Sequence, residues 1–585
     1  MSTADQDPRT PPPHRPLGLT RQIEALAWFS SALTLIAFGA ILSSIAVLPV
    51  VDAPNHAARL HIMANVETFR ALDWYDVVWR IQPNIALEAL YLALGAPDVY
   101  LYIKAWVGLS FALFLTGALA LRYELYGRLS VLTPLIPILF FTAAVRFGFL
   151  NFLLGSALIL WATWGQLRLQ HRRIGPKIVF GSVAGTLLFF AHPFALAIWG
   201  VVIGGLSLGS WRRAASVGTN LQAIGRALTI NLCEVLLPLL LFAIYVLNGS
   251  GGSEIFYASV IERLSGIARI TDLYDRSVGI AFCLMAASMI FLFSMRANKS
   301  DGRTLIHPDV ILPAVLLLVL AQVIPDQIGD SGELSWRLYP TMLALLLIGM
   351  RDDFLGPAAA RAVLLGSMAV MAWKLTSLST VWAEASRRHQ LVIEVLRFVP
   401  ENARVTGFLP HEPFAEMSHP WSLQHSLAYA TVERDAFVPN LFAFSVQQPL
   451  SYLPPQGRLR KDMSCFEDWE FEKVDWADTR RFFDHVLVVS SIEMADDWAE
   501  QVVPQGFAPV VETRTASLYA VTPPRPSPKP LTALPPEGAA LEACRQNLRF
   551  PDALLSNFDV ETLRRLGQST EARRARSEAR DGPED

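Results

Sequence analysis

Eleven apolar runs, separated by polar segments of varied length, lie in the first two thirds of the sequence. Helical segments of roughly 20 residues cross the hydrocarbon core of a bilayer. The runs 178–191 and 338–350 are short, so they must include polar residues at their ends. The sequence therefore predicts a polytopic α-helical membrane protein with about eleven transmembrane helices. The runs are 25–51, 99–121, 129–145, 147–167, 178–191, 194–210, 227–249, 277–295, 310–325, 338–350 and 362–382.

Charged residues are scarce, which agrees with lipid as the surrounding solvent. They make up 17% of the chain, whereas soluble domains carry about 25%. The net charge of -3 leaves no overall basic field that would attract nucleic acid. The first run is too long for the core of a signal peptide and lacks a cleavage site, so we expect it to be a retained helix.

Basic residues recur in alternate loops between the runs. Short loops rich in lysine and arginine stay on the cytoplasmic side of a membrane. We therefore expect a cytoplasmic N-terminus and, after eleven crossings, an extracytoplasmic position for everything beyond residue 382. The basic residues of these loops are Arg122, Arg128, Arg172, Arg173, Lys177, Arg212, Arg213, Arg226, Arg296, Lys299, Arg303, Arg351 and Arg361.

The composition divides the chain into four parts. Residues 1–23 form a cytoplasmic tail, and 24–382 form the transmembrane domain, whose long first outer loop is 52–98. In that loop the apolar stretch 85–94 is too short to span, which predicts a helix lying at the interface. From 383 to 522 short β-type runs at 404–409, 485–490 and 517–521 predict an α/β domain. The proline-rich and charged segment 523–585 is expected to be disordered.

The densest polar cluster follows the first run directly. A helix that begins near Pro54 would place Asp52, His56 and Arg59 on one face. A carboxylate at the membrane surface can accept a proton from an attacking hydroxyl or amine, and a neighbouring cation can hold a phosphate. Asp52 is equally a natural helix N-cap with a proline in the first turn. Both interpretations stay open.

Three further residues at outer helix ends are candidates for substrate binding. Arg146 and Arg337 can contact a lipid phosphate, although interfacial arginines often serve only as anchors. His192 precedes Pro193 at an outer turn, where an imidazole is commonly only a part of the turn. Inside the membrane, Glu234 is interpreted as a packed polar residue or as part of a proton path.

The chain resembles the C-type (GT-C) glycosyltransferase superfamily, near the group of dolichyl-phosphate-mannose–protein mannosyltransferases and aminoarabinose transferases. The resemblance rests on the acidic loop after the first helix, the segment Gln82-Pro83-Asn84, and C-terminal pieces such as Phe483-Asp484-His485. It implies a GT-C-like transmembrane domain with an extracytoplasmic α/β domain. It also implies a sugar donor on a polyprenyl phosphate and Asp52 as the catalytic base.

One departure from the superfamily concerns a second acidic residue, which many members carry in a later outer loop. The sequence offers Asp73, Asp76 and Glu88 in the first loop as substitutes. Whether a divalent metal takes part therefore stays open, and no other cofactor is expected. No metal-ligand spacing of cysteine and histidine is present.

The resulting hypothesis is a glycosyltransferase of the bacterial inner membrane that acts at the periplasmic face. Asp52 would serve as general base, and His56, Arg59, Arg146, His192 and Arg337 would bind substrate. The acceptor would be a lipid, a glycan or a protein. Two alternatives remain: a transporter or flippase for a lipid-linked envelope intermediate, which would depend on Glu234, and a non-catalytic envelope assembly factor.

Overall fold

The computed structural model describes most of the transmembrane region and part of the C-terminal region. The described residues are 17–170, 174–215, 221–248, 255–270, 273–296, 304–328, 332–408, 420–443, 448–453, 476–489, 506–513 and 515–523. Most of the predicted N-terminal tail, up to residue 16, and the predicted tail beyond residue 523 lie outside them.

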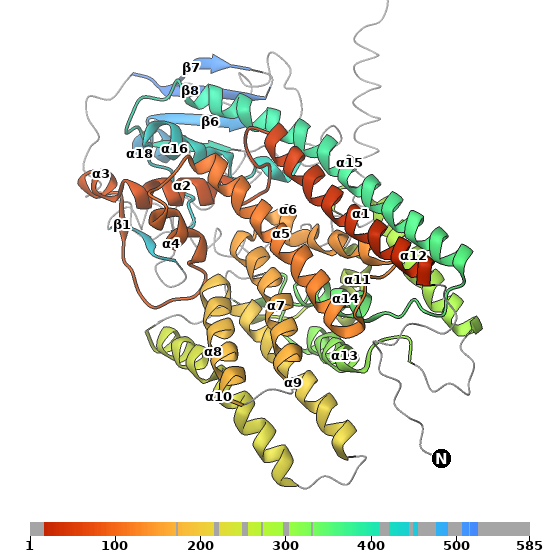
Figure 1. Ribbon diagram of the computed structural model, residues 1–585. Helices are drawn as coiled ribbons and strands as arrows, with labels where there is room; N and C mark the ends of the chain where they lie inside the picture. The colour runs from red at the N-terminus through yellow and green to blue at the C-terminus, as the bar shows by residue number, and fades with distance from the viewer. Residues whose placement is uncertain are drawn as a thin grey trace, which may run out of the picture. The chain divides into compact units, whose positions relative to one another are not determined.

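Long apolar helices dominate the described chain (Figure 1). Seven are long and apolar enough to cross a membrane: α1 (Leu17–Ser44), α5 (Val99–Tyr126), α7 (Leu150–Leu169), α8 (Ile174–Ala191), α10 (Leu221–Asn248), α12 (Arg276–Arg296) and α15 (Pro357–Leu396). Shorter apolar segments are η1 (Thr133–Phe140) with α6 (Ala143–Phe147), α9 (Pro193–Ala215), α13 (Pro308–Val323) and α14 (Leu338–Gly349). Every predicted run falls on one of these segments. The prediction of a polytopic α-helical membrane protein is confirmed.

The loops between these helices contain short elements. The predicted interfacial helix at 85–94 is present as a helix, α4. The other elements here are α2, α3, α11, β1 and the paired strands β2 and β3, while β5, the partner of β1, follows α15 in the sequence. Their bounds are α2 (Ala53–Ala64), α3 (Val66–Ala71), α4 (Ala86–Ala93), α11 (Val260–Arg269), β1 (Tyr75–Val77), β5 (Leu450–Tyr452), β2 (Ile255–Phe256) and β3 (Gln327–Ile328).

Helices α5 and α7 lie side by side and run parallel to each other (Figure 1). Residues further along α5 contact residues further along α7, as expected for two helices that run in the same direction. Two consecutive parallel helices need a return path between them. The segment between α5 and α7 must therefore carry the chain back across the transmembrane region. The contacts are Trp106 Nε1 to the Leu150 carbonyl (3.0 Å), Trp161 Nε1 to the Leu113 carbonyl (3.0 Å) and Arg168 Nη1 to Glu124 Oε2 (3.4 Å).

The return path corrects the prediction of one regular helix over 129–145. It is the 3-10 helix η1 followed by a bend and the short helix α6. Pro134 and Pro137 remove backbone donors, which disfavours an α-helix here. Every residue of η1 is buried. Burial in protein explains the irregular backbone, because lipid would leave its polar groups without partners.

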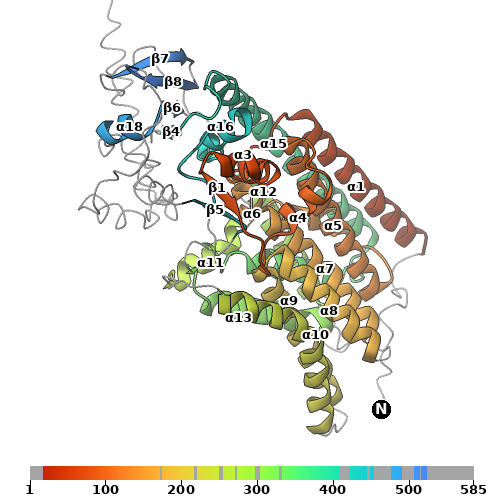
Figure 2. The same cartoon turned by 90° about the vertical axis from the view of Figure 1, so that its left-hand side faces the viewer.

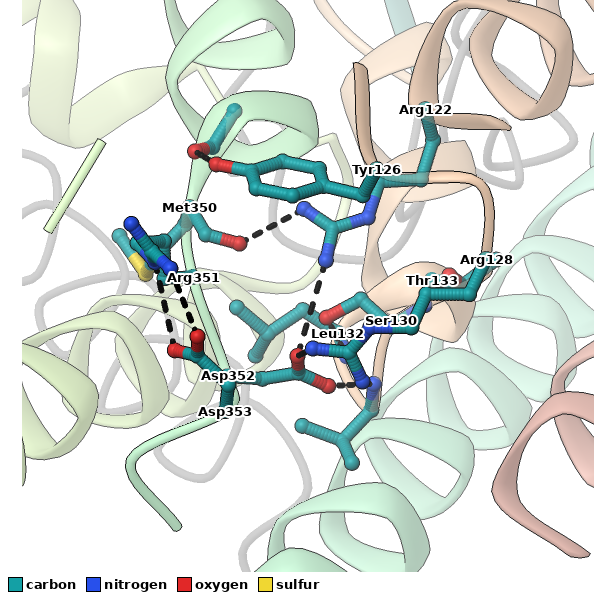
Figure 3. A network of polar contacts seen from close by, with 12 residues as sticks. Arg122, Tyr126, Arg128, Ser130, Leu132, Thr133, Met350, Arg351, Asp352 and Asp353 are labelled. Atoms are coloured by element: carbon teal, nitrogen blue, oxygen red, sulfur yellow. Dashed lines mark hydrogen bonds and ion pairs between the residues drawn. The ribbon is translucent and has the colours of Figure 1, made fainter. Parts of the chain in front are cut away.

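One end of the transmembrane region, which we call the clamp end, is fixed by Asp352 (Figure 3). This fully buried carboxylate lies 3.7 Å from Arg122 Nη2 and 3.1 Å from Arg128 Nη2. It also accepts a hydrogen bond from the Val131 N–H (3.1 Å). Arg122 Nη1 donates to the Met350 carbonyl (2.7 Å). The clamp therefore joins the end of α5, the start of the return path and the end of α14.

Some arginines of the basic loops have ion-pair partners at or near the clamp end. Arg122, Arg128 and Arg351 were counted as basic residues of two loops, but all three lie in ion pairs. Arg351 pairs with Asp353 (2.8 Å), and the other two share Asp352. These arginines therefore hold the ends of helices together in addition to any role in orientation.

A second compact unit comprises Glu67–Asp76, Leu391–Leu441 and Tyr452–Asp585. Its described part contains a four-stranded sheet in the order β4-β6-β8-β7 (Figure 2). β4 and β6 are parallel, and the other neighbours are antiparallel. The strands are β4 (Val405–Phe408), β6 (His485–Val489), β7 (Phe507–Glu512) and β8 (Ala516–Val521), and the helices are η2 (Pro420–Leu423), η3 (Ser426–Ala428), α16 (Tyr429–Arg434) and α18 (Trp476–Phe482). The three predicted strands coincide with β4, β6 and β8.

Part of the long first loop belongs to this second unit. The ring of Tyr75 stacks on that of Phe437 at 5.8 Å, and the Tyr75 hydroxyl donates to the Val438 carbonyl (3.0 Å). The predicted domain boundary at 383 falls inside α15, which continues without a break to Leu396. The division of the chain in space therefore does not follow a single cut in the sequence.

Candidate functional site

The residues that follow α1 are held against the loop that leads into α7. The Val51 N–H donates to the Arg146 carbonyl (3.1 Å), and the Asp52 N–H donates to the Phe147 carbonyl (2.9 Å). Two segments far apart in the sequence therefore fix the backbone of Asp52. We call this end of the transmembrane region the site end.

Gly148 makes this close approach feasible. Its φ of +85° is a left-handed conformation that residues with a side chain rarely adopt. A Cβ added there would lie 2.9 Å from Val50 Cγ2 and 3.2 Å from the Asp52 nitrogen. Glycine is thus required both by the backbone conformation and by the packing against Asp52.

Asp52 occupies the N-cap position of α2, with Pro54 in the first turn. Its side chain makes no capping hydrogen bond to the helix, however. Its negative charge instead raises the pKa of the Arg337 guanidinium, against the larger opposing effect of burial. The position is that of a cap, while the carboxylate acts electrostatically on Arg337.

Arg337 stands at the start of α14 with its guanidinium against two aromatic rings. Its Cζ lies 4.1 Å from the ring centroid of Phe149 and 5.6 Å from that of Phe152. Nη2 donates to the Gly332 carbonyl (2.8 Å), while Nε has no hydrogen-bond partner within the described residues. A guanidinium supported by rings and only partly satisfied is well suited to bind a phosphate.

Burial governs the electrostatics of this arginine. It lowers the pKa of Arg337 to about 10, and the negative charges of Glu333 and Asp52 oppose that shift. The side chain nevertheless stays charged at neutral pH. It therefore supplies a permanent, poorly hydrated positive charge at the site end.

Arg146 provides a second guanidinium close by. Its Cζ lies 5.2 Å from the ring centroid of Phe147. Its Nε is buried and has no hydrogen-bond partner among the residues described. Its positive charge lowers the pKa values of Tyr274 and Glu333, against the stronger effect of their burial. The structure therefore gathers Asp52, Arg146 and Arg337, all three proposed from sequence, around one region.

A small pocket lies beside Arg337 in the described structure. Its volume of about 20 Å³ is enough for a water molecule. Its walls are mostly apolar, with Phe149, Phe152 and Trp336 among them. The titratable groups that line it are Glu333 and Arg337. Burial raises the pKa of Glu333 to about 7, although both neighbouring arginines oppose the shift.

Glu333 is the residue that the sequence analysis missed. The loop 326–337 is acidic, yet nothing in the sequence singles out one carboxylate within it. A usable signal was its spacing, since Glu333 lies four residues before Arg337, the N-cap of α14. Its φ of +56° is also unusual for a residue with a side chain. Such backbone strain is common at functional sites.

His192 lies at the same end, between α8 and α9. Its Nδ1 accepts a hydrogen bond from the Phe194 N–H (3.1 Å), and Phe152 meets its ring edge-on at 5.3 Å. Burial first, and the charge of Arg337 second, lower its pKa well below the ordinary value. The imidazole is therefore neutral at neutral pH, with its proton on Nε2.

His56 and Arg59 belong to a buried network instead of lining the pocket. Arg59 forms an ion pair with Glu88 of α4, and each side chain is only 1% exposed. Arg59 Nη2 also lies 2.7 Å from His56 Nδ1, and Nη1 donates to Gln448. His56 Nε2 approaches the Gly148 carbonyl (3.2 Å). These contacts tie α2 to α4 and support the helix that begins at the catalytic candidate.

The other acidic candidates have different surroundings. Asp76 pairs with Arg70 (2.7 Å), and Asp73 adopts a left-handed conformation in the same second unit. Glu234 in α10 is fully buried, 3.2 Å from Lys177 Nζ. Among the described residues no group of three or more histidine, cysteine, aspartate or glutamate side chains could hold a metal ion.

Comparisons with known proteins give likeness of fold alone. No protein-family model matches the sequence, and no curated protein matches it. Among solved structures, ArnT from Cupriavidus metallidurans bound to undecaprenyl phosphate is similar with a TM-score of 0.48 and 11% identity, over 84% of this chain and 97% of ArnT. The arabinofuranosyltransferase AftD from Mycobacteria is similar with a TM-score of 0.40 and 14% identity, over 84% of this chain and 41% of AftD.

Proposed function

We propose that the protein transfers a sugar from a polyprenyl-phosphate-linked donor to an acceptor, with Asp52 as the general base. The observation that carries the proposal is the placement of a non-capping carboxylate within electrostatic reach of a ring-supported, partly satisfied arginine. The resemblance of the sequence to the GT-C superfamily supplies the donor class. The periplasmic face is part of the proposal and follows from the basic loops.

The reaction needs two groups at opposite sides of the sugar carbon. Asp52 would take the proton from the acceptor hydroxyl or amine as its heteroatom bonds to the anomeric carbon. The bond from that carbon to the phosphate oxygen breaks, and the polyprenyl phosphate leaves with the electron pair. Arg337 and Arg146 would stabilise the negative charge on the leaving phosphate. His192, neutral with Nε2–H, would donate a hydrogen bond without adding charge.

The test of this proposal is the variant Asp52→Asn in purified protein reconstituted into nanodiscs. Donor and acceptor both come from a bacterial envelope extract that contains polyprenyl-linked sugars together with lipid, glycan and protein acceptors. The released undecaprenyl phosphate is measured by mass spectrometry. Loss of a general base should lower the rate by about 100-fold or more. The melting temperature should stay close to that of the wild type, because asparagine has nearly the same shape as aspartate and is an equally favourable residue at a helix N-cap.

The matched control is Asp98→Asn. Asp98 is an exposed carboxylate that caps α5 by accepting from the Leu101 N–H (2.7 Å), a role asparagine retains. This variant should release undecaprenyl phosphate at the wild-type rate. A wild-type rate in Asp52→Asn would overturn the role of Asp52. Absence of any released polyprenyl phosphate with the wild-type protein would overturn the donor class.

The transport alternative makes a different prediction with the same material. It requires Glu234, whose carboxylate is paired with Lys177 and hydrogen-bonded to Gln166. Glu234→Gln should leave sugar transfer intact if the protein is a transferase. A transporter would be favoured if transport of the lipid-linked intermediate were lost in Glu234→Gln and kept in Asp52→Asn. An assembly factor would depend on neither residue.

A further inference from the structure

Glu333 has no part in the reaction just described, yet it lines the pocket beside Arg337, the residue proposed to hold the leaving phosphate. It lies four residues before Arg337 in the sequence. Its backbone is held in a left-handed conformation, with φ at +56°. Strain of this kind persists only where the surroundings enforce it.

Few charged groups in the described structure act on the Glu333 carboxyl group. Arg337 at the start of α14 and Arg146 in α6 both act on its carboxyl group. Asp52 and His192 are coupled to Arg337, and Tyr274 is coupled to Arg146. The other residues that line the pocket carry no titratable side chain. The two cations favour a carboxylate, but burial outweighs them, so the pKa of Glu333 is about 7.

An incoming phosphate changes this balance. It brings a negative charge toward the same two arginines, and a second anion beside it would be repelled. A neutral carboxyl group avoids that repulsion and can donate an O–H hydrogen bond to a phosphate oxygen. Of the two forms of Glu333, the protonated one is therefore complementary to a bound phosphate.

We infer that the protein binds the phosphate of its lipid-linked substrate against Arg337 with Glu333 protonated, so that phosphate binding takes up one proton at Glu333. The inference rests on the proposed function for the identity of the ligand. The proton comes from solvent and returns to solvent when the polyprenyl phosphate leaves. Glu333 is thus a phosphate-contacting residue whose protonation sets the affinity.

The experiment measures binding and proton uptake of the full-length protein in nanodiscs. The probe is the methyl ester of undecaprenyl phosphate, a phosphodiester whose own charge stays constant between pH 5 and pH 9. Calorimetry in two buffers of different ionisation enthalpy gives the number of protons taken up. The wild type should take up close to one proton at pH 8 and almost none at pH 5.5. The Kd should weaken by about tenfold per pH unit above pH 7.

Two variants sharpen the result. In Glu333→Gln the side-chain N–H replaces the carboxyl O–H, so the affinity should stay near the low-pH wild-type value at every pH, with no proton uptake. Glu262→Gln is the control, since Glu262 is exposed on α11 and glutamine can keep its capping contact with the Ser259 N–H. It should behave as the wild type.

The outcomes separate this inference from the proposed function. Binding without proton uptake at pH 8, or the same uptake in Glu333→Gln, overturns the role of Glu333 and leaves the proposed function standing. Failure of the wild type to bind the probe at any pH overturns the donor class and this inference together. If Glu333→Gln does not fold, absence of proton uptake by the wild type at pH 8 still overturns the role of Glu333.

Discussion

Replacing Gly148 with alanine should slow sugar transfer by displacing Asp52. The added Cβ would lie 2.9 Å from Val50 Cγ2, about 0.5 Å inside the ordinary contact distance of 3.4 Å. It would also lie 3.2 Å from the Asp52 nitrogen, which is fixed by its bond to the Phe147 carbonyl (2.9 Å). Relief of this overlap requires the Asp52 backbone to move by a few tenths of an ångström.

The size of the effect follows from the sensitivity of catalysis to position. A misplacement of about 1 Å can cost 100-fold in rate, so a shift of up to half that size should cost roughly three- to tenfold. Alanine in a left-handed conformation also lowers the free energy of unfolding by about 1–2 kcal/mol. A loss of rate alone would therefore not distinguish misplacement from instability.

Gly95→Ala is the matched control for that instability. Gly95 has a similar φ of +78°, but a Cβ there would meet no atom within 4 Å. The two variants should share the backbone penalty, and only Gly148→Ala should lose rate in the undecaprenyl phosphate release assay at a temperature where both are folded. Equal rates in the two variants would refute the claim that Gly148 positions Asp52.

Three further outcomes are expected. Asp352→Asn should lower the free energy of unfolding by about 3–5 kcal/mol, since it leaves buried arginines unpaired, whereas Asp353→Asn, in a more exposed pair, should cost at most about 1 kcal/mol; thermal melting of both variants would show equal losses if the clamp were unimportant. Arg337→Lys keeps the charge but loses the planar contact with aromatic rings, so undecaprenyl phosphate should bind roughly tenfold more weakly; an unchanged Kd would contradict the ring-supported site. Burial raises the pKa of Glu333 from 4.5 to about 7, so the folded state holds an extra proton in that window and the melting temperature should fall as pH rises through it; Glu333→Gln should remove this component, and an unaltered profile would argue against it.

Most of the transmembrane helices could be predicted from the sequence, because long apolar runs indicate segments that lie in lipid. The run at 129–145 is the instructive failure. Its mean hydropathy suits a transmembrane helix, but Pro134 and Pro137 prevent a regular one, and the protein encloses the segment instead. Hydropathy measures the preference for an apolar surrounding and does not distinguish lipid from the protein interior.

The candidate site was partly predictable, because charged residues at the ends of apolar runs are visible in the sequence. Asp52, Arg146 and Arg337 were chosen for their position at helix ends on one side. In the structure Asp52 acts electrostatically on Arg337, and both arginines act on Glu333. Arg59 was chosen because it shares a helix face with Asp52, but its guanidinium forms an ion pair with the buried carboxylate of Glu88. Glu333 could not be selected, because its importance comes from the burial of its carboxyl group, which only the packing of several segments creates.

The buried return path between α5 and α7 has a consequence for how the protein is made. Helices enter the bilayer one after another as the ribosome synthesises them. Each regular α-helix forms its backbone hydrogen bonds within itself. η1 cannot do so, since its 3-10 backbone and two prolines leave polar groups that lipid does not accept. One of its packing neighbours is α14, which is synthesised almost 200 residues later. The nascent chain must therefore shelter this segment until α14 has been translated, so completion of the transmembrane region depends on a helix encoded far downstream.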